Sequence, residues 1–309
     1  RNLAIGRQAL EYSLTGENNI AIGYQAMGDT DRGSSSNDSD HNIAIGSLAM
    51  SGDWEDVKSE TNIAIGSSSM AGVLNGALNN VAVGTNTLVA LTQGDGNVAI
   101  GSEAGGGMTL ASNNVVIGYA AGAHNVSFTT GDYCTIVGSL ADVSTADAQG
   151  QIAIGYNTSC IADSTATLGN STNTASLGLD GSDTSWAAAS DERYKENIET
   201  STAGLSFIKD LRPVTYNWKK AKDVPVDMPD YKEGSDKPVR GHEYGTTLHG
   251  FVAQEVKELI DGHSEIKEGF QMWKEADNGV QTIADGNLIP MLVKAVQELS
   301  AKVKALEDA

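Results

Sequence analysis

A five-residue motif, Asn-Leu-Ala-Ile-Gly at its first occurrence, recurs along the first half of the chain and constrains its fold more than any other feature. Successive motif glycines are 17 to 23 residues apart, and a small side chain follows each glycine three positions later. A fixed motif with variable polar spacers indicates one structural unit per repeat, with the insertions in surface turns. The copies span residues 2–6, 19–23, 42–46, 62–66, 80–84, 97–101, 114–118, 134–138 and 151–155.

Alternation within the motif predicts a short strand. Ile20 and Ile22 would lie on one face and Ala21 on the other, and both apolar faces should be buried. We therefore expect a coil of parallel strands whose branched face fills the interior and whose alanine face meets another chain. A homotrimer satisfies this arrangement, although the motif does not determine the number of chains. Stacking would align Asn2, Asn19 and their successors in a hydrogen-bonded ladder, with the motif glycine allowing a sharp turn.

The pattern Asn-x-Ala-Ile-Gly-x-x-Ala resembles the head repeat of trimeric autotransporter adhesins, and similar repeats occur in phage fibres. The resemblance implies a trimeric, all-β, repetitive β-roll or β-solenoid shaft over residues 1–160. The spacers here are longer than in the adhesin repeat. Residues 161–189, where the motif degenerates, are expected to be a transition segment.

The polar spacers hold candidate receptor contacts, which can equally be solvated connectors. Four acidic residues there could ligate calcium, but they lack a fixed loop signature, so we assign no metal site and no cofactor. The candidate contacts are Tyr12, Tyr24, Trp54 and Tyr119, and the acidic residues are Asp29, Asp31, Asp38 and Asp40.

Charge and cysteine content exclude several classes of protein. A net charge of -20 argues against nucleic-acid binding, which needs clustered cations. Residues 1–189 hold 4 basic and 18 acidic side chains, whereas residues 190–309 hold 16 basic and 22 acidic ones. This change in charge composition predicts a domain boundary near residue 190. We expect no membrane insertion. Cys134 and Cys160 are expected to be buried free thiols, with a disulfide as the alternative.

The segment from Ser190 to Ile198 (Ser-Asp-Glu-Arg-Tyr-Lys-Glu-Asn-Ile) begins a second set of motifs. Three blocks follow in order, Leu-Arg-Pro-Val-Thr-Tyr at 211–216, Gly-Phe-Val-Ala-Gln-Glu-Val at 250–256 and Leu-Ile-Pro-Met-Leu-Val at 288–293. Together they closely resemble the intramolecular chaperone domain of endosialidase tailspikes and related phage fibres, an auto-processing serine peptidase family. The resemblance implies an α+β chaperone over residues 190–309.

The resemblance further implies a Ser190–Lys195 dyad that hydrolyses the bond between Ala189 and Ser190. A serine hydroxyl needs a base, and Lys195 can serve only when neutral, so we expect its desolvation. Those residues taken alone are equally a helix N-cap followed by a solvated lysine. The oxyanion donors stay unassigned among Asp191, Asn197, His242 and His249.

An apolar seam spaced by three and four residues ends the chain and predicts a trimerising coiled-coil helix. A single amphipathic helix packed on its own domain is the alternative. The seam residues are Ile289, Leu292, Val296, Leu299, Val303 and Leu306.

These features together predict the distal segment of a bacteriophage tail fibre or tailspike, assembled in the host cytoplasm and carried on the virion. We expect it to be a piece of a longer protein, with other tail proteins on its N-terminal side. Its receptor would be a host glycan or outer-surface protein. The alternatives are a cell-surface trimeric adhesin, for which no membrane anchor pattern is evident, and a glycan-degrading tailspike, for which no carboxylate pair is evident.

Overall fold

The computed structural model of the chain describes all residues except 13–15, 30–38, 55–56, 182–185, 189 and 241–242. It contains two compact units, Arg1–Tyr194 and Lys195–Ala309, and each is described by itself. The sequence places the boundary slightly earlier, at residue 190.

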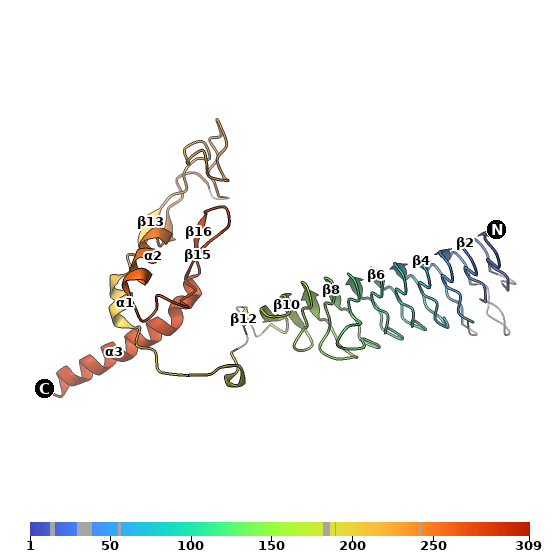
Figure 1. Cartoon of the computed structure of the whole chain (residues 1–309), viewed down its shortest axis with the longest axis horizontal. Coiled ribbons are helices and arrows are strands. Elements are labelled where there is room, and N and C mark those ends of the chain that lie inside the picture. The colour runs from blue at the N-terminus through green and yellow to red at the C-terminus, as the bar shows by residue number, and fades with distance from the viewer. Residues whose placement is uncertain (13–15, 30–38, 55–56, 182–185, 189, 241–242) are drawn as a thin grey trace. The chain divides into compact units, whose positions relative to one another are not determined.

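The first unit is a β-solenoid in which each motif copy forms one three-residue strand. The nine strands stack in parallel in chain order (Figure 1). Equivalent motif positions pair, so that Ala21 is in register with Ala4 on one side and Ala44 on the other. The predicted repetitive β-solenoid is therefore confirmed. The strands are β1 (Leu3–Ile5), β2 (Ile20–Ile22), β3 (Ile43–Ile45), β4 (Ile63–Ile65), β5 (Val81–Val83), β6 (Val98–Ile100), β7 (Val115–Ile117), β8 (Thr135–Val137) and β9 (Ile152–Ile154).

The predicted orientation of the two strand faces is wrong. Central alanines such as Ala64 are fully buried inside the coil, whereas Ile63 and Ile65 on either side remain partly exposed. Large side chains from the turns, among them Met50 and Met70, are fully buried in the same core. Because they fill the narrow interior, the strand can add only a small side chain there. The first and third residues of β1–β9 thus line the outside, and we call them the branched stripe.

The asparagine ladder is confirmed. The Oδ1 atom of Asn97 accepts hydrogen bonds from the backbone N and the Nδ2 of Asn114, both at 3.1 Å. The Nδ2 of Asn97 in turn donates to the carbonyl of Ala111 at 2.7 Å. The same pattern runs from Asn19 onward, and the backbone N of Cys134 donates to Asn114 at its end. Buried amides therefore tie each coil to the next.

Three further strands close the shaft sheet within the segment expected to be a transition. β10 (Thr165–Gly169) pairs in parallel with β9, and β11 (Thr174–Gly178) then turns back antiparallel to β10. β12 (Ala187–Ala188) pairs antiparallel with β11 and is the last strand of the sheet. The change from parallel to antiparallel pairing ends the solenoid.

The second unit combines helices with two small antiparallel sheets, as expected for an α+β domain. Its core contains Phe207, Val256, Ile260, Met272 and Leu288. The elements are α1 (Leu205–Asp210), β13 (Val214–Tyr216) paired with β14 (Leu248–Gly250), α2 (Ala253–Gly262), β15 (Trp273–Glu275) paired with β16 (Gln281–Ile283), η2 (Asp285–Leu288) and α3 (Ile289–Glu307).

An arm connects β13 to β14. Its two sides meet at an isolated bridge between Lys220 and Pro238. Lys220 and Lys222 place their Nζ atoms 2.7 and 2.8 Å from Asp236. These two lysines lower the pKa of Asp236 to about 2, chiefly through hydrogen bonds. These ion pairs connect the two sides of the arm.

Candidate functional site

Ser190 follows closely on the last strand of the shaft. In β12, Ala187 is in register with Ser176 and Ala188 with Ala175 of β11. Ala189 lies outside the described residues, and Ser190 is exposed. Sequence reasoning missed β12, because two alanines carry little strand propensity. Ala187 and Ala188 are therefore part of the shaft sheet.

A tight turn follows Ser190. The Oδ1 of Asp191 accepts hydrogen bonds from the backbone N of Arg193 at 2.8 Å and from its Nε at 3.0 Å, and Oδ2 accepts from NH2 at 2.6 Å. The guanidinium lowers the pKa of Asp191, and this carboxylate raises the pKa of Arg193. The short helix η1 (Glu192–Tyr194) forms here. The side chain of Asp191 thus accepts a hydrogen bond from the backbone of this short turn.

Lys195 is exposed and is the first residue of the second unit. Ser190 and the turn that follows it belong to the end of the first unit. The two residues of the expected dyad are therefore assigned to different units, and the dyad stays a prediction. Among the suggested oxyanion donors, Asn197 is exposed with a positive φ of 54°, and His249 is exposed on β14. His242 lies outside the described residues.

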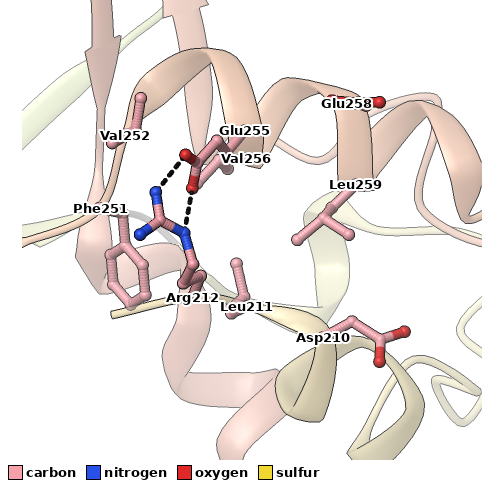
Figure 2. Close-up of a pocket in the computed structure, with 9 residues that line it drawn as sticks. All are labelled: Asp210, Leu211, Arg212, Phe251, Val252, Glu255, Val256, Glu258 and Leu259. Atoms are coloured by element: carbon pink, nitrogen blue, oxygen red, sulfur yellow. Dashed lines mark hydrogen bonds and ion pairs between the residues drawn. The ribbon is translucent and has the colours of Figure 1, made fainter. Parts of the chain in front are cut away.

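Two of the four sequence blocks meet in the second unit. Arg212 donates two hydrogen bonds to Glu255 at the start of α2, one of them from Nε to Oε2 at 3.0 Å. The hydrogen bonds from Arg212 lower the pKa of Glu255. Both residues line a cavity of about 290 Å³, together with Leu211, Phe251 and Leu259 (Figure 2). The pair joins the 211–216 block to the 250–256 block and supports the fold around the cavity.

Helix α3 leaves its predicted seam uncovered. The six seam residues, Ile289, Leu292, Val296, Leu299, Val303 and Leu306, are between 45 and 78% exposed. By contrast, Ala295 is buried, and the carboxylate of Glu298 accepts a hydrogen bond from the backbone N of Leu205 at 3.0 Å. Helix α3 therefore packs on α1 through another face, and the seam remains available in the single chain.

The candidate receptor contacts divide into two groups. Trp54 is only 4% exposed and belongs to the shaft core, so its prediction as an exposed contact is wrong. A large apolar ring within a spacer can fold back onto the coil. Tyr12, Tyr24 and Tyr119 are exposed as expected.

The predicted thiols are confirmed as free and buried, and burial raises the pKa of Cys134 to about 11.

Among the acidic residues considered as calcium ligands, Asp40 accepts a hydrogen bond from the backbone N of Glu17 and lies 3.7 Å from Lys58. Asp31 and Asp38 lie outside the described residues. Within the described part of the chain, no group of three or more His, Cys, Asp or Glu side chains is arranged to hold a metal ion.

The chain combines a β-solenoid shaft with a small α+β unit whose C-terminal helical seam is exposed. A family model described as chaperone of endosialidase matches residues 190–264, so this segment is similar to that family of chaperone domains. This match, next to a β-solenoid, supports the expected organisation of a tail-fibre or tailspike-type protein with an intramolecular chaperone. Neither a curated protein nor a solved structure matches the chain. The helices among the described residues include none long and apolar enough to cross a membrane.

Proposed function

We propose that this chain is the distal segment of a host-adhesion fibre whose C-terminal domain trimerises, sets the register of the shaft and then cuts the chain between Ala189 and Ser190. One observation carries the proposal. The family match begins at Ser190, two residues after the last strand of the shaft sheet ends at Ala188. A self-cleaving domain thus starts where the shaft stops.

The chemistry follows from the residues at this position. The Oγ of Ser190 attacks the carbonyl carbon of Ala189, and neutral Lys195 accepts the hydroxyl proton. An Oγ–C ester bond forms while the C–N peptide bond breaks, and Lys195 returns the proton to the departing amine of Ser190. Water then hydrolyses the ester. The products are a carboxylate at Ala189 and a free amine and hydroxyl on Ser190.

Assembly would supply the activation that this step needs. Lys195 is exposed in the single chain, and a lysine can act as a base only in its neutral form. Burial against neighbouring chains would remove water from its ammonium group and favour the neutral form. Cleavage would then follow trimer formation and would not occur in monomers.

Two uncovered apolar surfaces support a homotrimer. The seam of α3 offers one, and the branched stripe of the shaft offers the other. Side chains such as Ile65, Ile100 and Ile154 are each about 40% exposed along this stripe. A continuous row of branched side chains is costly to leave in water. Packing three stripes together would bury it and align the coils of the three chains.

A folding domain is useful to such a shaft because its pairing must start in the correct register. Long-range parallel pairing is slow to nucleate, and a trimer held at one end raises the local concentration of the three shafts. Removing the helper afterwards would leave a shaft whose persistence is set by its unfolding rate. Exposed tyrosines on the outer turns, such as Tyr24 and Tyr119, are candidates for contact with a glycan or surface protein of the host.

Intact-mass measurement of the assembled protein tests the proposal. Wild-type protein should yield a fragment ending at Ala189, and Ser190→Ala and Lys195→Arg should remain whole, because arginine stays protonated. Ser206→Ala, an exposed serine on α1, is the matched control and should be cut like the wild type. An uncut wild-type trimer, or cleavage that persists in Ser190→Ala, would refute the assignment.

A further inference from the structure

The short strand β12 ends immediately before Ala189. Its two residues are in register with Ala175 and Ser176 of β11. A strand of two residues has too few bonds to persist by itself and depends on its partner. Ala187 and Ala188 are therefore held in place only while β11 is formed.

β11 in turn depends on the completed shaft. It pairs over five residues with β10, and Thr167 and Ser176 join their hydroxyls at 2.9 Å in a buried contact between the two strands. β10 is itself stacked on β9, the last coil of the solenoid. The backbone N of Leu179 also donates to the carbonyl of Ser164 at 2.6 Å. A chain in which the last coils have not closed thus has no docking edge for β12.

The chain just after the expected cut is also structured within the same unit. Asp191 binds the backbone and guanidinium of Arg193, and the backbone N of Tyr194 donates to the carbonyl of Asp191 at 3.2 Å. Fixed elements therefore lie on both sides of the bond, with β12 ending at residue 188 and the turn beginning at residue 191.

We propose that β12 is a positioning element for self-cleavage, so that pairing of Ala187 and Ala188 with β11 makes cutting conditional on closure of the shaft at its C-terminal end. This inference rests on the proposed cleavage between Ala189 and Ser190. The Oγ of Ser190 must reach a carbonyl carbon in its own preceding residue, and misplacement by about 1 Å can cost about 10²-fold in rate. Holding both flanks restricts the conformations available to the bond.

Two consequences follow from this arrangement. Cleavage occurs only after the C-terminal end of the shaft has folded, because β12 cannot pair until β10 and β11 have formed. After the cut, β12 stays on the shaft as a very short edge strand, and short edges resist pairing with other molecules. The new chain end is therefore retained on the fibre and does not leave with the chaperone.

The test is a proline substitution in β11 that leaves the cleavage sequence untouched. In Ser176→Pro, the lost N–H and the fixed φ should disrupt the ladder. The C-terminal domain is unchanged, so the protein should still trimerise, and cleavage should slow by about 10²-fold. The control is Ser176→Thr, which retains the hydroxyl and favours strands, and it should be cut at about the wild-type rate. A Ser176→Pro trimer that is cut at the wild-type rate would overturn the inference.

Hydrogen exchange in the Ser190→Ala trimer gives an independent test if Ser176→Pro does not assemble. Because an edge strand directs alternate N–H groups to its neighbour, at least one amide of Ala187 and Ala188 should be protected. Rapid exchange at both would contradict the inference. If the wild type itself remains uncut, the proposed function fails instead, and protected amides would still establish the pairing of β12.

Discussion

Asn97 and Asn114 occupy equivalent positions in successive coils, and the side-chain carbonyl of Asn97 accepts two hydrogen bonds from Asn114 inside the shaft. Both residues are fully buried. Asn97→Ala would leave buried donors of Asn114 without this acceptor, at about 1–3 kcal/mol for each unsatisfied group. We expect a lower denaturant midpoint for the shaft. Asn125→Ala, an exposed asparagine whose backbone bond to Asp142 is retained, should leave the midpoint nearly unchanged, and equal effects would contradict the ladder's role.

Stacked motif glycines give a second test of the coil geometry. Gly84 has a φ of +140°, and a Cβ placed on it would lie 2.5 Å from the carbonyl oxygen of Gly101. Gly84→Ala must therefore separate two coils as well as strain the backbone. We expect loss of soluble, folded shaft or a large fall in its thermal midpoint. Gly262→Ala, which meets nothing within 4 Å, is the control, and similar behaviour of both variants would argue against this packing.

The inward and outward faces of the strands predict opposite responses at neighbouring positions. Ala64 is fully buried, so Ala64→Leu overpacks the coil and should cost about 1–3 kcal/mol of unfolding free energy. Ile65 is 38% exposed, and Ile65→Leu should leave the unfolding free energy of the single chain almost unchanged. Chemical denaturation of the two variants distinguishes the faces. A larger loss of unfolding free energy in Ile65→Leu than in Ala64→Leu would indicate that the branched face, and not the alanine face, lies inside the coil.

Sequence alone revealed the repeat, the register and the ladder, because all three follow from equal motif positions stacking upon one another. It misassigned the faces because alternation separates Ile63 from Ala64 without indicating which side is enclosed. That choice depends on turn residues such as Met50 and Met70, which variable spacers bring into the core. Ser190 stays a prediction made from its resemblance to a family motif, whereas β12 was missed because its pairing is dictated by β11 and not by the propensity of two alanines.

The arm between β13 and β14 should loosen in acid. The lysine partners hold the pKa of Asp236 at about 2, below its unfolded value of 3.8. A depressed carboxyl pKa contributes stability above the unfolded value, and this contribution is lost as pH falls through about 2. Pepsin digestion between about pH 1.5 and 4 should therefore cut the arm faster at the acid end. Asp236→Asn should be cut readily throughout, whereas Asp227→Asn should follow the wild type, and a pH-independent arm in wild type would contradict the prediction.

The seam of α3 is expected to hold three chains together. Val296 is 64% exposed in the single chain, and Val296→Glu would place three carboxylates in the centre of an apolar seam, where unpaired charge is costly. Sedimentation analysis should show monomers for this variant and trimers for the wild type. Gln297→Glu adds the same charge at an exposed neighbouring position outside the seam and should remain trimeric. Because the proposed cleavage depends on assembly, Val296→Glu should also remain uncut. A monomer that is cut at the normal rate would show that a single chain suffices to activate Ser190.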